Sequence, residues 1–211
     1  MNKVFLIGDS IRMGYDKYVK MAFEDVAEVL YPNENCRFAS YVLRYLNMWK
    51  QSMEFGDDID LVHWNAGLWD CLRMIDGKPH TDIKVYGDYI ERICKCMPYY
   101  FPRAKFIFAT STPVQEHLFK ELKRYNKDIE AYNKVAMEIV TKHGHSVNDL
   151  YPLVENMPVE YYSDLTHLYT KGGTKLLADA VISSIEKELN INANPLDYDE
   201  LFKDKEEIVG I

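Results

Sequence analysis

The sequence predicts a three-layer α/β/α protein built on a sheet of five parallel strands. Five short apolar segments alternate with five longer segments of helical periodicity, and parallel strands need such crossovers between them. The first apolar segment, residues 4–7, is continuous, which is typical of a strand buried on both faces. With 211 residues that are 47% hydrophobic, the chain is long enough for one well-packed domain and short for two.

Each expected element has local signals at its ends. The strands are expected at residues 4–7, 26–31, 59–67, 105–110 and 145–150, and Pro32 and Pro113 follow the second and fourth of them. The helices are expected at residues 12–21, 38–53, 82–97, 125–143 and 168–189. Pro98 should end the third helix because proline lacks the amide that continues a helix. Gly144 suits the position just after the fourth helix.

The alternating strands and helices fill residues 1–189 and predict a single flavodoxin-like domain. No internal repeat or linker interrupts this domain. Residues 190–211 form an acidic extension in which a short helix is expected at 199–207. This extension either packs along the surface of the domain or is partly disordered.

The overall composition disfavours several classes of function. A net charge of −8 without a basic stripe argues against nucleic-acid binding, and no apolar run has the length of a membrane span. The chain starts with a strand rather than a signal peptide, and its four cysteines lack paired spacing, so we expect reduced thiols and a cytoplasmic location. The histidine spacing suggests no metal site, and without a glycine-rich phosphate loop we expect no nucleotide cofactor. The sequence gives no indication of oligomeric state.

Two polar motifs lie at positions that suit a catalytic site. Gly8, Asp9 and Ser10 follow the first strand directly, so Ser10 is expected at the carboxyl end of a central strand, where open sheets bind ligands. Asp164 and His167 lie three residues apart, just before the last helix. A serine hydroxyl becomes a nucleophile when an imidazole takes its proton and a carboxylate orients that imidazole. We therefore predict that one loop presents Asp164 and His167 to Ser10, although each motif alone also suits a helix cap.

With these motifs near its two ends, the chain resembles the SGNH (GDSL) hydrolase family over residues 4–189. Members of that family are serine esterases on a flavodoxin-like sheet. The run Gly8-Asp9-Ser10-Ile11 is similar to the family's Gly-Asp-Ser-Leu block, which implies that Ser10 is the nucleophile. The run Asp164-Leu165-Thr166-His167 is similar to the Asp-x-x-His block, which implies that Asp164 orients His167 as the general base. The resemblance implies acyl transfer without a metal or organic cofactor.

The two middle blocks depart from the family pattern. The second block normally offers a glycine amide to the oxyanion of the reaction, and alignment of the following helix puts Cys36 in that place. The third block normally reads Gly-x-Asn-Asp, but here Trp69 stands where the asparagine is expected. Asn65 lies two residues before Gly67 and on the same face of the strand. We hypothesise that Asn65 completes the oxyanion hole with the amides of Ser10 and Cys36; alternatively, it only bonds neighbouring backbone.

Two further residues, Asp9 and Trp69, have two competing interpretations each. Asp9 is predicted to contact the substrate, but its oxygens also suit a helix cap. Trp69 is predicted to form a wall of the substrate pocket, with core packing as the alternative. Asp70 is expected to cap or brace the loop after the third strand.

We therefore expect a serine ester hydrolase whose partner is a small-molecule ester. In particular, we expect the removal of a small acyl group such as acetyl from a carbohydrate. One alternative is a lysophospholipase or thioesterase with the same residues. Another is a non-catalytic binding module with a degraded oxyanion hole, which the substitution at Trp69 favours and the presence of Ser10, Asp164 and His167 disfavours.

Overall fold

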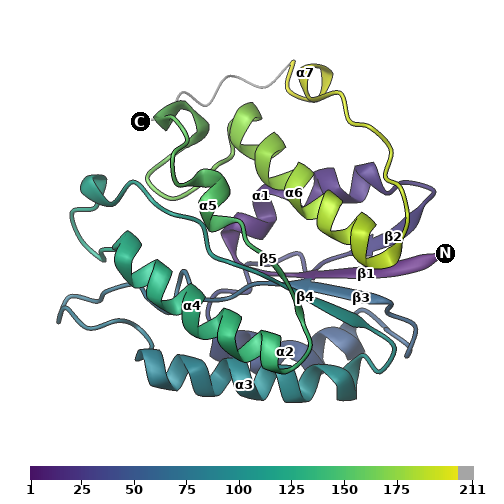
Figure 1. Cartoon of the computed structure of the whole chain (residues 1–211), viewed down its shortest axis with the longest axis horizontal. Coiled ribbons are helices and arrows are strands. Elements are labelled where there is room, and N and C mark those ends of the chain that lie inside the picture. The colour runs from purple at the N-terminus through teal and green to yellow at the C-terminus, as the bar shows by residue number, and fades with distance from the viewer. Residues whose placement is uncertain (204–211) are drawn as a thin grey trace.

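A computed structural model describes residues 1–203 of the chain and contains one sheet of five parallel strands (Figure 1). The strand order is β2-β1-β3-β4-β5, so the first strand lies inside the sheet. The strands are β1 (Asn2–Ile7), β2 (Ala27–Leu30), β3 (Leu61–Trp64), β4 (Lys105–Ala109) and β5 (Ser146–Asn148). Every neighbouring pair is parallel, as the alternation of strands and helices predicts.

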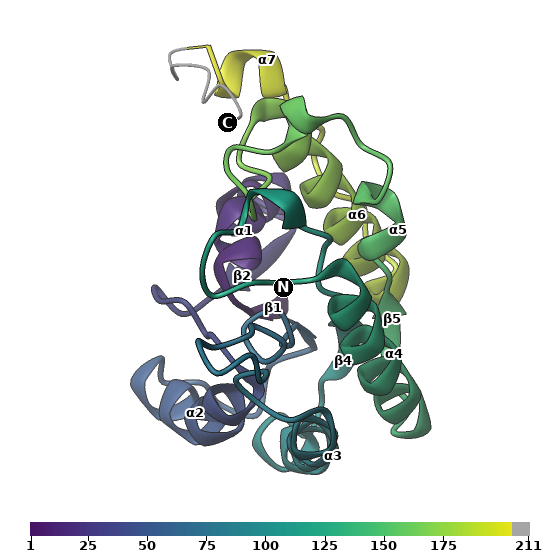
Figure 2. The same ribbon diagram turned by 90° about the vertical axis from the view of Figure 1, so that its left-hand side faces the viewer.

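The helices form a layer on each face of this sheet (Figures 1 and 2). On one face α1 (Ser10–Ala22) packs against α6 (Lys171–Leu189). On the other face α3 (Ile83–Tyr100) packs between α2 (Ala39–Ser52) and α4 (Asn126–Lys142). The shorter helices are α5 (Tyr151–Val154), α7 (Tyr198–Leu201) and two 3₁₀ turns, Glu116–Leu118 and Val159–Tyr161. These layers confirm the predicted three-layer fold.

The position of β1 decides where a site can form. Residues 4–7 are fully buried because β2 and β3 flank the strand and helices cover both of its faces. The chain leaves β1 toward β2 on one side and later returns to β3 on the other. The crevice at such a reversal opens beyond the carboxyl ends of the strands. Figure 2 looks onto this end of the molecule, where β1 leads directly into α1.

The observed element boundaries differ from the expected ones in two respects. Helix α3 continues through Pro98 to Tyr100, whereas the sequence predicts its end at residue 97. Pro98 lies in the last turn, where the amide of Phe101 still bonds to the carbonyl of Met97, so the missing proline amide costs only one bond. The 3₁₀ turns and α5 were not expected, because segments of three or four residues show no periodicity.

The first part of the C-terminal extension packs against α1. Asn190 ends α6 in the left-handed conformation, and the amide of Asn194 then donates to the carbonyl of Ala22 at 2.7 Å. Phe202 stacks on Tyr18 of α1 with ring centroids 5.5 Å apart. Of the helix expected at 199–207, the structure has α7 at Tyr198–Leu201, and residues 204–207 lie outside the described range. Within residues 1–203, no helix is both long enough and apolar enough to cross a membrane.

Candidate active site

Ser10 is the first residue of α1 and follows β1 after only two residues. Asp9 caps this helix, because its side chain accepts a hydrogen bond of 2.9 Å from the amide of Ile11. Gly8 is needed at the turn because Asn65 comes very close: a Cβ at this position would lie 2.0 Å from Asn65 Oδ1. The first amides of a helix have no partner within the helix and carry partial positive charge. Ser10 is thus fixed at a point that favours negative charge.

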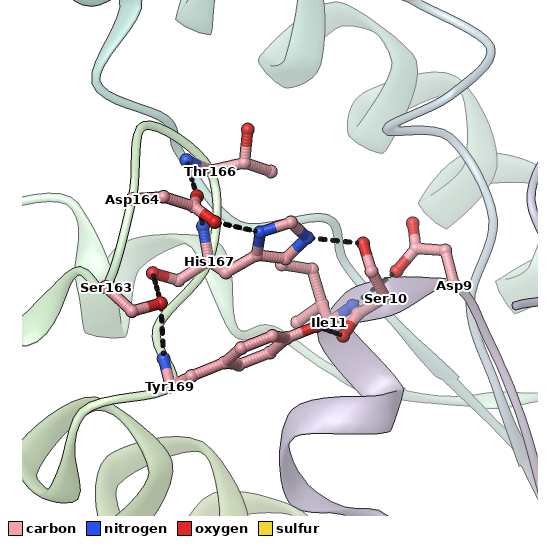
Figure 3. A network of polar contacts seen from close by, with 8 residues as sticks. All are labelled: Asp9, Ser10, Ile11, Ser163, Asp164, Thr166, His167 and Tyr169. Carbon is pink, nitrogen blue, oxygen red and sulfur yellow. Dashed lines mark hydrogen bonds and ion pairs between the residues drawn. The ribbon is translucent and has the colours of Figure 1, made fainter. Parts of the chain in front are cut away.

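The structure brings Ser10, His167 and Asp164 together (Figure 3). His167 Nε2 lies 2.7 Å from Ser10 Oγ, and His167 Nδ1 lies 2.6 Å from Asp164 Oδ2. His167 and Asp164 come from the loop between the second 3₁₀ turn and α6, more than 150 residues after Ser10. A neutral imidazole in this arrangement donates its Nδ1 proton to Asp164 and accepts from the serine hydroxyl at Nε2. The three groups therefore form one continuous chain of hydrogen bonds, in which His167 can take the serine proton while Asp164 orients the ring.

The loop that carries Asp164 holds this carboxylate in place. Asp164 Oδ1 accepts the amides of Thr166 and His167, both at 2.7 Å, while Oδ2 faces the imidazole. Burial alone would raise the pKa of Asp164, but the hydrogen bonds from the His167 ring and these two amides outweigh it and lower the pKa. Asp164 is accordingly a carboxylate at neutral pH. It serves both as the turn former and as the acceptor for His167.

Asp9 lies beneath Ser10 at the start of α1, and its contact with substrate stays a prediction. Its side chain is completely buried and caps α1 below Ser10. Burial raises its pKa against the opposing effects of the Ile11 amide, the Asn65 side chain and the nearby charges of Arg124 and His167. The helix-capping interpretation is confirmed.

The amide of Cys36 already has a partner within the protein, which argues against its predicted role as an oxyanion donor. It donates to the carbonyl of Gly8 at 3.0 Å and so ties the loop after β2 to the end of β1. The thiol is buried, and burial raises its pKa to about 11. Cys36 is therefore a packed structural residue beside the turn at Ser10.

Asn65 lies next to the same turn. Its amide donates to the carbonyl of Ile7 at 3.0 Å, and its side chain packs on Gly8 and acts on the Asp9 carboxylate. The side chain is 97% buried, with 3% of its surface exposed. These contacts fit the interpretation that Asn65 bonds its neighbours, and its role as an oxyanion donor stays a prediction.

The turn after β3 carries Trp69 and Asp70. Asp70 is fully buried, and its Oδ2 accepts the amide of Ala39 at 3.0 Å, so it links this turn to the start of α2. Its carbonyl also accepts the amide of Thr81, which confirms the expected bracing role. Trp69 is half-buried, and its contact with substrate stays a prediction.

Two residues at the site were not predicted. Arg124 donates from Nε to the carbonyl of Leu68 at 2.8 Å, and its guanidinium interacts with the charges of Asp9 and Asp164. Burial lowers its pKa, and the described residues include no carboxylate within ion-pair distance of it. Tyr169 lies against both His167 and Ser10. No local pattern marks either residue, because each reaches the site through tertiary contacts.

Comparisons with known proteins agree with this architecture. No family model and no curated protein matches the sequence. Among solved structures, a lipase/acylhydrolase from Enterococcus faecalis is 19% identical with a TM-score of 0.70, and the match covers 93% of this chain and all of that one. An acetyl xylan esterase is 16% identical with a TM-score of 0.68, over 87% of this chain and 99% of the other. A protein of the lipolytic G-D-S-L family from Veillonella parvula is 15% identical with a TM-score of 0.61, over 87% and 97%. The chain therefore has the fold of the GDSL (SGNH) hydrolases.

Proposed function

We propose that this protein is a serine ester hydrolase in which Ser10 is the nucleophile, His167 the general base and Asp164 the residue that orients it. One observation carries the proposal: hydrogen bonds of 2.7 and 2.6 Å join the Ser10 hydroxyl, the His167 ring and the Asp164 carboxylate in the order that acyl transfer requires. These distances place the Ser10 hydroxyl within proton-transfer reach of its base.

The proposed reaction proceeds in two halves. In the first, His167 Nε2 takes the hydroxyl proton as Ser10 Oγ attacks the ester carbonyl carbon, and the same proton then passes to the leaving alcohol. In the second, water attacks the acyl-serine while His167 takes one of its protons, and that proton returns to Ser10 Oγ as the acid leaves. Asp164 stabilises the imidazolium in both halves and stays ionised, consistent with its lowered pKa.

The negative oxygen of each tetrahedral intermediate needs hydrogen-bond donors. The amide of Ser10 at the start of α1 is the first that we propose, because helix geometry leaves it without a partner in its own helix. The positive charge of Arg124 favours the same developing charge, since it lies within electrostatic range of Asp164 and Asp9 at the site. Asn65 remains the candidate third donor through its side-chain amide.

For the substrate, we propose a small acyl group, most simply acetyl, on a carbohydrate or a similar small alcohol. The resemblance to an acetyl xylan esterase in fold supports this class, and the half-buried Trp69 supplies a candidate wall for a short acyl chain. A lysophospholipase or thioesterase would use the same three residues, but with a long acyl chain.

The test is hydrolysis of p-nitrophenyl acetate, butyrate and octanoate by the wild type, Ser10→Ala and Asn65→Ala. Ser183→Ala, an exposed serine on α6, is the matched control. We expect turnover of the acetate ester that Ser10→Ala abolishes and the control keeps. Preference for octanoate would favour the long-chain alternative. Equal rates for wild type and Ser10→Ala on every ester would overturn the proposal in favour of a binding module.

A further inference from the structure

The side chain of Tyr169 contacts both the nucleophile's residue and the base (Figure 3). Its hydroxyl donates to the main-chain carbonyl of Ser10 at 2.5 Å. Its ring stacks on the imidazole of His167, with centroids 4.7 Å apart and planes inclined by 27°. Burial raises the pKa of Tyr169, so the phenol keeps the proton that it donates. One side chain thus bridges the loop before α6 and the first turn of α1.

The position of Tyr169 is itself fixed from two sides. Ser163 Oγ accepts the Tyr169 amide at 3.3 Å and donates to the His167 carbonyl at 3.1 Å, which closes the loop around the base. On the opposite side, α1 has Gly14, where a Cβ would lie 2.5 Å from Tyr169 Cε1. Glycine destabilises a helix relative to alanine, so α1 gives up helical stability at the place where the ring passes.

These contacts act on two quantities that the proposed chemistry depends on, the distance from Ser10 Oγ to the imidazole and the stability of the imidazolium. The hydroxyl holds the backbone of Ser10, and with it the distance from Oγ to the imidazole. The ring face restricts rotation of His167 and, through its negative quadrupole, favours the imidazolium that forms when the base takes the serine proton. The effect of the ring on the imidazolium is larger in the transition state than in the resting enzyme, because the positive charge develops there.

We propose that Tyr169 is a positioning residue that clamps Ser10 and His167 together, an inference that rests on the proposed function of the site. It acts on the reaction through Ser10 and His167, because it contacts the Ser10 main chain and the face of the His167 ring. A residue that only fills space would affect stability, whereas a clamp also affects kcat and the pH dependence of the reaction.

The test separates the two contacts. Tyr169→Phe keeps the ring and loses the hydroxyl, and we expect kcat for p-nitrophenyl acetate to fall by about 2- to 10-fold. Tyr169→Leu loses both contacts, and we expect a fall on the order of 10- to 100-fold with KM nearly unchanged. Tyr161→Leu is the matched control, because this tyrosine packs on Gly172 at the start of α6.

The pH profile supplies the second readout. Because the stacked ring favours imidazolium, its removal should move the acidic limb of the kcat/KM profile to lower pH in Tyr169→Leu and leave it in place in Tyr169→Phe. Asp164 and Asp9, which also act on His167, are retained in every variant. An NMR titration of the His167 ring in Ser10→Ala with and without Tyr169→Leu measures the same shift without turnover.

The two proposals fail in different ways. If Ser10→Ala hydrolyses esters as well as the wild type, the proposed function is wrong. If hydrolysis depends on Ser10 but Tyr169→Leu keeps both the kcat and the midpoint of the acidic limb of the wild type, the function stands and the clamp is refuted. A loss of thermal stability in Tyr169→Leu with both of these values unchanged also refutes it.

Discussion

Replacement of Asp164 by asparagine separates the two tasks of this carboxylate. Asparagine keeps an oxygen that can accept the amides of Thr166 and His167, so the turn survives. In place of Oδ2, however, it presents an NH₂ group to His167 Nδ1. The imidazole must then carry its proton on Nε2, which faces Ser10 Oγ and can no longer accept the hydroxyl proton.

The expected consequence is a large loss of activity with a small loss of stability. We expect kcat of Asp164→Asn to fall by about 10³- to 10⁴-fold, the effect of the wrong tautomer in a serine–histidine–aspartate triad. The free energy of unfolding should fall by about 1 kcal/mol or less, because the lost contacts are charge-assisted hydrogen bonds at a partly exposed site.

The assay is steady-state hydrolysis of p-nitrophenyl acetate, paired with urea unfolding. Asp82→Asn is the matched control, because Asp82 is an exposed aspartate whose Oδ1 also accepts an amide two residues later, at 2.9 Å. Retention of more than a tenth of wild-type kcat by a folded Asp164→Asn would refute the tautomer argument.

Three further predictions follow from other parts of the structure. Arg124→Gln should lower kcat by about 10-fold or more, but by less than the ~10²–10³-fold loss of a full oxyanion donor. Arg124→Lys, which keeps the charge, should retain part of this activity. Equal kcat in the wild type and both variants would show that Arg124 takes no part in the reaction. Gly14→Ala should lower the free energy of unfolding by about 1–3 kcal/mol in the wild type, but not in Tyr169→Leu, where the ring that the new Cβ would meet is absent. Equal effects in both backgrounds, measured by urea unfolding, would contradict the contact between Gly14 and Tyr169. Burial lowers the pKa of His63 to about 3. Below the unfolded-state pKa of about 6.5, the unfolded chain binds a proton at this residue that the folded protein does not. The free energy of unfolding should therefore fall by about 1.4 kcal/mol per pH unit as the pH falls from 6.5 toward 3. His63→Gln should flatten this slope in melting curves between pH 6.5 and 4, whereas an unchanged slope would place the effect elsewhere.

The alternation of apolar and helical segments predicts the fold, and the motifs near the two ends of the chain predict that Ser10, His167 and Asp164 come together. Continuous apolar residues 4–7 have no stable place except inside a sheet, and the turn after them puts Ser10 at the sheet's carboxyl edge. Asp164 and His167 share one short loop, so their spacing allows the carboxylate to reach the ring. These contacts depend on short-range geometry, which a sequence records directly.

The rest of the site depends on contacts between distant segments. The Cys36 amide is taken by the Gly8 carbonyl, and this follows only from the packing of two loops. Arg124 reaches Leu68 across 56 residues of sequence. The burial of Asp9 is likewise a tertiary property, because the same residue at an exposed helix start would face solvent. Spacing within a segment carries no information about such contacts.

The central claim is that Ser10 is a nucleophile activated by His167. The most direct measurement is intact-protein and peptide mass spectrometry after incubation with p-nitrophenyl ethylphosphonate, which phosphonylates activated serines and releases nitrophenol. We predict one adduct per chain, located on Ser10, absent from Ser10→Ala and formed much more slowly in a folded His167→Asn. Unmodified wild type, or an adduct that persists in Ser10→Ala, would contradict the proposed active site.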